Sequence, residues 1–205
     1  MFSLMKAAND TIDVRQHILD TAHGMMSSRG FTAVGLNDLL SAAGVPKGSF
    51  YHYFRSKEGF GEELLRRYFD DYLKAMDETF SEEGQTGRER LMAYWRHWLD
   101  TQTTHDARSK CLVVKLAAEV ADLSEGMRGV LLSGTGRIVA RLARAIADAR
   151  ADGSLSIDDD PARLAETLYQ TWLGASLLQK ITRDGAPLRA AMETTTRALG
   201  QGAHS

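Results

Sequence analysis

The amino-acid sequence predicts an all-α fold. Only three prolines, Pro46, Pro161 and Pro187, interrupt its 205 residues, so long segments are free of this helix breaker. Within these segments apolar residues recur every three or four positions rather than alternating, which is typical of amphipathic helices. Glycines, serines and an Asp-Pro pair separate the segments and favour helix ends.

Composition narrows the class of protein. Apolar residues make up 43% and charged residues 25% of the chain, and neither a transmembrane run nor a signal-like start is present in the sequence. We therefore expect a soluble, cytoplasmic protein of one or two domains. A formal charge of -2 gives no global signal for polyanion binding, so any surface for nucleic acid has to be local.

The first predicted helix covers residues 13–29. Its apolar face consists of Val14, Ile18, Ala22 and Met25. Gly30 is a plausible C-terminal cap because glycine adopts the left-handed conformation that often follows a helix.

Three further helices are expected before residue 80. The first covers residues 36–43, turns Leu36, Leu39 and Leu40 inward, and stops at Gly44. Pro46 opens the next short helix, since proline suits the first helical position. Ser56 is a good N-cap for a long helix over residues 57–80.

The remaining sequence predicts five more helices. Ser124 and Asp160 are N-cap candidates, and Gly153 follows the end of one long segment. The expected helices cover residues 88–103, a segment beginning near Cys111, and residues 124–151, 161–182 and 187–199. Aromatic residues cluster in two of them, and for most we expect a place in a core or a dimer seam rather than in an effector pocket; they are Tyr94, Trp95, Trp98, Tyr169 and Trp172.

The two short helices joined by Gly44-Val45-Pro46 have the layout of a helix-turn-helix, whose second helix enters the DNA major groove. That second helix, PKGSFYHYF, has Phe50 and Phe54 as apolar anchors. Three consecutive residues cannot all face one core, so the polar and aromatic side chains between the anchors are expected to be exposed. Candidate DNA-contacting residues are Lys47, Gly48, Ser49, Tyr51, His52 and Tyr53.

Residues 31–60, FTAVGLNDLLSAAGVPKGSFYHYFRSKEGF, resemble the DNA-binding domain of the TetR family of bacterial repressors. The resemblance implies a helix-turn-helix domain over residues 1–56, a larger helical effector and dimerisation domain over residues 57–205, and a homodimer built by the last two long helices. It also implies that Lys57 contacts a DNA phosphate. Many members open the second helix with threonine, whereas this chain has Val34-Gly35, so a phosphate contact there falls to backbone or to Asn37.

Local charge supports DNA binding only weakly. Residues 1–60 contain six lysines and arginines against five aspartates and glutamates. We therefore expect a dimer that places two modules on a pseudo-palindromic operator, with an affinity that falls steeply as salt rises.

Cys111 is the only cysteine in the sequence. An intramolecular disulfide is therefore impossible, and any redox chemistry must involve another molecule, another chain or another type of side chain. Its position near a predicted helix start, with Arg108, Lys110 and Lys115 close in sequence, favours a reactive thiolate. The competing interpretation is a small buried hydrophobe, which is how free cysteine usually behaves.

The resemblance extends to the second half of the chain. Residues 45–61, 111–128 and 169–183 are similar to one branch of the TetR family, whose members sense quinones, reactive carbonyls and hypochlorite through a single cysteine. That cysteine matches Cys111, and a lysine that matches Lys180 is its proposed partner in a reversible sulfur–nitrogen link. The implied targets are detoxification genes, such as those of a flavin-dependent ene-reductase or a glyoxalase.

Two other functions remain open from the sequence. The first alternative is a repressor that answers to a non-covalent small ligand, with Cys111 structural. The second is a thiol enzyme that pairs Cys111 with a histidine such as His105. The helix-turn-helix pattern argues against the enzyme. His97 and His105 lack metal-ligand spacing with the cysteine, so we expect neither a metal site nor a cofactor.

Overall fold

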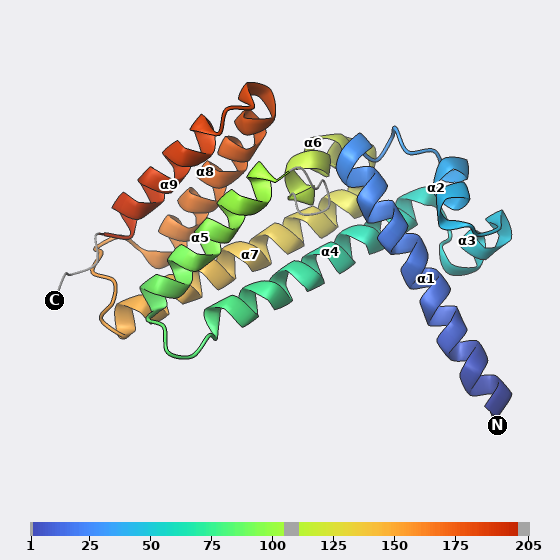
Figure 1. The fold of residues 1–205 in the computed structure, drawn as a ribbon, viewed down its shortest axis with the longest axis horizontal. Coiled ribbons are helices and arrows are strands. Elements are labelled where there is room, and N and C mark those ends of the chain that lie inside the picture. The colour runs from blue at the N-terminus through green and yellow to red at the C-terminus, as the bar shows by residue number, and fades with distance from the viewer. Residues whose placement is uncertain (1, 105–110, 201–205) are drawn as a thin grey trace. The chain divides into compact units, whose positions relative to one another are not determined.

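The computed structural model describes residues 2–104 and 111–200, and every regular element in these ranges is an α-helix (Figure 1). The all-α prediction is confirmed. The helices are α1 (Phe2–Arg29), α2 (Leu36–Ala43), α3 (Lys47–Tyr53), α4 (Lys57–Phe80), α5 (Gly87–Thr103), α6 (Leu112–Leu123), α7 (Glu125–Ala151), α8 (Pro161–Thr182) and α9 (Ala186–Ala198).

The predicted capping residues explain why most helix ends fall where the sequence places them. The Ser56 hydroxyl accepts a hydrogen bond from the Gly59 amide at 3.0 Å, at the start of α4. Asp160 caps α8 in the same way, with its carboxylate 2.9 Å from the Arg163 amide. Such side chains satisfy first-turn N–H groups that have no partner within the helix.

Three details differ from the sequence-based expectations. Helix α1 begins at Phe2 rather than at residue 13, because no proline or glycine interrupts residues 2–12. On its apolar face Met26, fully buried, takes the place predicted for Met25, since four-residue steps continue from Ile18 and Ala22. Leu36 is only half-buried.

The chain forms two compact units. The first comprises Met1–Tyr68 and Asp106–Leu131, and the second comprises Phe69–His105 and Leu132–Ser205. In the first unit, α1 packs with α2 and α6, and α2 packs with α3. The domain boundary expected at residue 56 stays a prediction.

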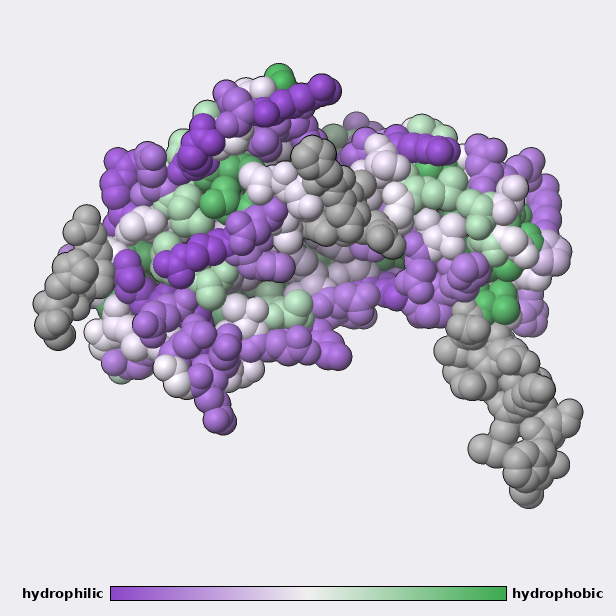
Figure 2. Space-filling view, in the orientation of Figure 1, coloured by the Kyte–Doolittle hydropathy of each residue, from purple (hydrophilic) through white to green (hydrophobic). Residues whose placement is uncertain are grey.

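The second unit has an aromatic core. Helices α5, α8 and α9 lie side by side (Figure 1), and Trp95 of α5 stacks on Trp172 of α8 with ring centroids 5.2 Å apart. Trp98 and Trp172 donate their indole N–H to Ser176 and Thr195 at 3.0 and 2.8 Å. All five of these clustered aromatic residues are buried, whereas the sequence led us to expect this for most of them. On the visible face hydrophilic side chains line the helices, with apolar ones between them (Figure 2).

Candidate nucleic-acid interface and sensing site

A tight turn sets the angle between α2 and α3. Gly44 adopts the left-handed conformation (φ 65°), and its amide and that of Val45 donate to the carbonyls of Ser41 and Leu40 at 3.2 and 3.1 Å. These bonds satisfy the last carbonyls of α2 while reversing the chain, as in a C-terminal capping motif. The left-handed conformation therefore explains why the turn of the predicted helix-turn-helix contains glycine.

Helix α3 buries one side and exposes the other. Phe50 is fully buried and packs against Phe54 and Phe60, with ring centroids 5.1 and 5.3 Å away. Tyr51, one position along, is 51% exposed. Of the other candidates, those exposed are Asn37, Lys47, Gly48 and His52, and those half-buried are Ser49, Tyr53 and Lys57.

Gly48 is not required by the packing of the protein. A Cβ atom built on it meets nothing within 4 Å, and its φ angle is not one that favours glycine. Space for a side chain therefore exists on the exposed surface of α3. This fits a site where another backbone comes close, which is the predicted reason for glycine here.

Lys57 lies at the first residue of α4 and contacts the core of the first unit. Its Nζ atom is 4.9 Å from the centroid of the Phe31 ring, a cation–π arrangement. The ammonium group is thus held at a helix N-terminus, where backbone N–H groups also attract anions.

Cys111 is buried and immediately precedes α6. The residue is 8% exposed and occupies the N-cap position, yet its side chain makes no capping hydrogen bond. The hydroxyl of Tyr68, on α4, donates to Sγ over 3.6 Å, and the Tyr68 ring meets His23 edge-on at 6.2 Å. A helix N-terminus and a hydroxyl donor both stabilise negative charge on sulfur.

The structure does not test the other predicted partners of the Cys111 thiol. Lys180 is half-buried on α8 and belongs to the second unit, whereas Cys111 belongs to the first. Arg108, Lys110 and His105 lie outside the described residues. The sulfur–nitrogen pairing of Cys111 with Lys180 therefore stays a prediction.

Sequence reasoning missed two residues near the thiol and the DNA-binding module. One is Tyr68, the hydroxyl donor to Cys111. The other is Glu119 of α6, whose carboxylate accepts the amides of Phe31 and Thr32 at 3.1 and 2.6 Å and contacts the Thr32 hydroxyl. Both contacts join residues more than forty positions apart, so no local sequence pattern reports them.

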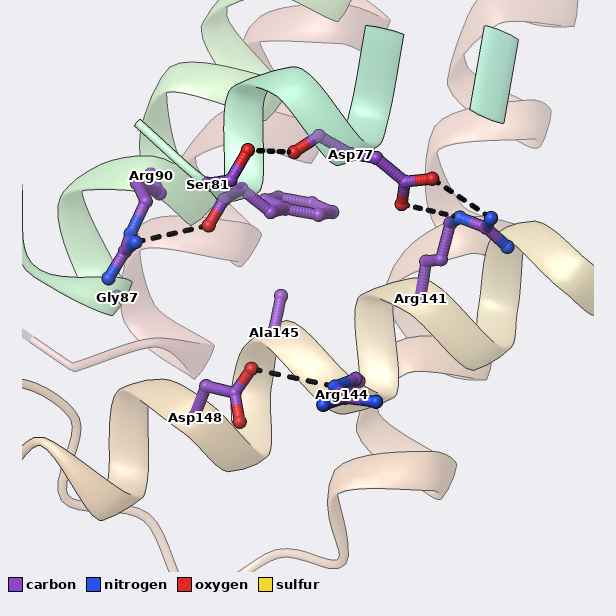
Figure 3. A pocket seen from close by; sticks show the side chains of 9 residues that line it. Asp77, Ser81, Gly87, Arg90, Arg141, Arg144, Ala145 and Asp148 are labelled. Atoms are coloured by element: carbon purple, nitrogen blue, oxygen red, sulfur yellow. Dashed lines mark hydrogen bonds and ion pairs between the residues drawn. The ribbon is translucent and has the colours of Figure 1, made fainter. Parts of the chain in front are cut away.

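An open pocket lies in the second unit between α4, α5 and α7 (Figure 3). Arg141 and Asp77 face each other across it, with nitrogen–oxygen distances of 2.7 and 3.0 Å. The hydrogen bonds from Arg141 hold the pKa of Asp77 below its usual range. Arg90 donates to the Phe80 carbonyl at 3.1 Å, so these two arginines are engaged within the protein.

Neither a metal centre nor a membrane span is found in the described part of the chain. Across residues 2–104 and 111–200, no three His, Cys, Asp or Glu residues are grouped so as to hold a metal ion. No helix described over these ranges is both long enough and apolar enough to cross a bilayer.

Comparison with known proteins places the chain in a family. Residues 18–64 match the bacterial regulatory proteins of the tetR family, and residues 87–195 match the tetracyclin repressor-like C-terminal domain. The HTH-type transcriptional repressor NemR of Escherichia coli is 42% identical over 180 residues, which are 88% of this chain and 90% of that protein. The chain belongs to the TetR family. The transcriptional regulator AcuR of Cereibacter sphaeroides is 32% identical over 192 residues, which are 94% of this chain and 88% of that protein.

Solved structures agree with this assignment. The crystal structure of the reduced form of E. coli NemR superposes with a TM-score of 0.88 at 41% identity, covering 94% of this chain and all of that one. TetR-family repressors bind operator DNA as dimers, and the relatives are regulators rather than enzymes. This chain is accordingly a TetR-type transcriptional repressor, and the enzyme alternative falls away.

Proposed function

We propose that this repressor leaves its operator when Cys111 reacts with an electrophile or oxidant, and that it controls detoxification genes. One observation carries the proposal: the thiol occupies the N-cap of α6 while its sulfur contacts Tyr68 of α4. A group added to this buried sulfur has to displace what surrounds it, because close-packed interiors hold no spare volume. The similarity to NemR supports the same assignment.

The DNA-reading surface of the proposal is the exposed side of α3. Lys47 and Lys57 would neutralise phosphates, and Tyr51 and His52, both exposed, would reach base edges and sugars. Asn37, Gly48, Ser49 and Tyr53 complete this surface. The dimer, built through α8 and α9, would set the spacing of two α3 helices to successive turns of the major groove.

The chemistry with a quinone is a conjugate addition. The sulfur of Cys111 forms a bond to a ring carbon, and the thiol proton passes to one quinone oxygen. The hydrogen on the attacked carbon then moves as a proton to the other oxygen, which gives the hydroquinone, and no group leaves. With hypochlorous acid, the oxygen passes to the sulfur as chloride and the thiol proton leave, which gives a sulfenic acid. Attack of the neutral Lys180 amine on this sulfur would release water and form the sulfur–nitrogen link. Intact-protein mass spectrometry separates the two products, since the first adds a quinone and the second removes two hydrogen atoms.

Release from DNA tests the proposal. A duplex selected from a random pool by the reduced protein is incubated with it, and binding is measured before and after addition of 1,4-benzoquinone. We expect the wild-type protein to release the duplex and Cys111→Ser to retain it. Equal release by the variant would eliminate the thiol as sensor, while the repressor assignment would stand.

The burial of Cys111 favours one competing function, a repressor that binds a non-covalent ligand and uses Cys111 only for packing. Thiol reductants distinguish the two. A reductant restores DNA binding after hypochlorite treatment if the sulfur is the sensor, and leaves induction by a non-covalent ligand unchanged.

A further inference from the structure

We infer that Glu119 is the coupling residue that passes the state of Cys111 to the DNA-binding module. The inference rests on the proposed function. It assigns to a single side chain the transmission of a change at the Cys111 thiol to helix α3. Its basis is a cluster of contacts within the first unit, where α6, the turn after α1 and the start of α4 meet.

The carboxylate of Glu119 is bound to the turn between α1 and α2 by three donors. One oxygen accepts from the Phe31 amide at 3.1 Å, and the other accepts from the amide of Thr32 at 2.6 Å and from its hydroxyl. Both N–H groups follow the end of α1, where the chain no longer forms helical hydrogen bonds. Bonds to an ionised acceptor are stronger than those between neutral groups.

Gly30 completes the fit between α6 and this turn. Its φ angle of 96° lies in the left-handed region, and a Cβ atom built there would stand 2.9 Å from a Glu119 oxygen. The φ angle therefore favours glycine at position 30, and a side chain there would also press against the end of the Glu119 side chain.

The pKa of Glu119 agrees with a functional carboxylate. Partial burial opposes ionisation, yet the hydrogen bonds from Thr32 and Phe31, together with nearby Lys115, hold the pKa of Glu119 below its usual value. The carboxylate is thus charged at neutral pH and able to keep all three donors.

Phe31 carries the connection from the turn to α4. Its side chain is 2% exposed, and its ring lies so close to Gly61 that a Cβ atom there would be 2.7 Å from it. The same ring supports the ammonium group of Lys57 at 4.9 Å. A shift of the Glu119 carboxylate therefore moves the residue on which a proposed phosphate contact rests.

The thiol stands at the other end of the same rigid helix. Cys111 and Glu119 are eight residues apart, which is about 12 Å along a helix rising 1.5 Å per residue. Continuous backbone hydrogen bonds join the residues of this 12-residue helix, so a displacement at its first turn is expected to reach Glu119 without unfolding. The path thus runs from Cys111 through α6 and Glu119 to Phe31 and Lys57.

Glu119→Gln tests this role, because it keeps the shape of the side chain but cannot accept from all three donors. The measurement is the ratio of DNA dissociation constants with Cys111 alkylated by benzoquinone and with it reduced, on a duplex selected by the reduced wild-type dimer. We expect the ratio to fall by about 2- to 30-fold relative to wild type. The extent of alkylation, followed by intact mass, should match wild type.

Asp122→Asn is the matched control, since it removes one negative charge from an exposed position on the same helix. It should leave the ratio unchanged. Thr32→Val removes only the hydroxyl donor and should lower the ratio by a smaller factor. This variant tests the same role if the Glu119→Gln protein does not fold.

Each outcome identifies what fails. A Glu119→Gln protein that binds DNA more weakly in both states with an unchanged ratio shows a merely structural carboxylate and overturns the inference. If alkylated wild-type protein itself keeps its DNA, the proposed function fails and the coupling role fails with it. Release by wild type and equal release by Glu119→Gln would overturn the coupling role alone.

Discussion

Cys111 combines burial with an environment that stabilises negative sulfur. Its 8% exposure restricts the access of reagents, so small oxidants should react with the thiol faster than bulky maleimides. The Tyr68 hydroxyl donates to Sγ over 3.6 Å. In the proposed function this donor, from another helix, supports the reactive form of the thiol.

Tyr68→Phe should slow the reaction of Cys111 with benzoquinone by about fivefold, the worth of an ordinary hydrogen bond of about 1 kcal/mol. Stopped-flow measurement of quinone loss gives the rate. Tyr72→Phe, one turn further along α4, removes a hydroxyl that contacts Tyr94 instead, and should react like wild type. An unchanged rate for the Tyr68 variant would remove this residue from the sensing chemistry.

Gly48→Ala should weaken DNA binding by roughly tenfold while leaving the fold intact. The added methyl group meets open space on the protein, so only a molecule outside it is obstructed. Fluorescence anisotropy with a selected duplex and thermal melting measure the two effects. Gly129→Ala, which also meets nothing within 4 Å but lies on α7, is the control and should bind DNA normally.

Helix boundaries were predictable because their determinants are local. Ser56, Ser124 and Asp160 each cap the helix that the sequence assigns to them. The contacts of Glu119 and Tyr68 could not be predicted from the sequence. A hydrogen bond between residues 43 or 87 positions apart depends on how helices pack rather than on any nearby residue. The early start of α1 was missed because no capping signal marks it.

Helix α8 exposes an apolar stripe on the second unit. Leu177, Leu178 and Ile181 are 53%, 51% and 71% exposed, although each sits on a helix whose other side is fully packed. An exposed group of this kind marks an interaction surface. It agrees with the proposal that α8 and α9 form the dimer.

Ile181→Asp should therefore convert the dimer to a monomer, because it buries an unpaired charge in the interface. Sedimentation velocity at micromolar concentration measures the change, and DNA binding should be lost with it. Leu123→Asp, at a 48% exposed position on α6, should remain dimeric. A dimeric Ile181→Asp protein would move the interface away from this stripe.

In the proposed function, the complete repressor has two states, and the thiol shifts the balance between them. We propose that the reduced protein holds the Glu119 contacts described above, and that modification favours a state in which the two α3 helices no longer match successive major grooves. The pocket around Asp77 and Arg141 plays no part in this account, since its principal charges already pair with each other.

Acid should weaken the first unit through Glu119. Its pKa is below the usual 4.5, so the carboxylate stabilises the folded state above pH 4.5 and that stability is lost as pH falls through the lowered value. Melting temperature should therefore drop more steeply below pH 4.5 for wild type than for Glu119→Gln. Parallel curves for the two proteins would show that Glu119 ionisation does not stabilise the fold.

The central claim is that modification of Cys111 itself causes release from DNA. The most direct test follows both events in one sample, with intact mass giving the alkylated fraction and anisotropy giving the released fraction as benzoquinone is added. We expect release to rise with the alkylated fraction in wild type and to stay absent in Cys111→Ser. Full alkylation with the operator still bound, or release from the serine variant, would contradict it.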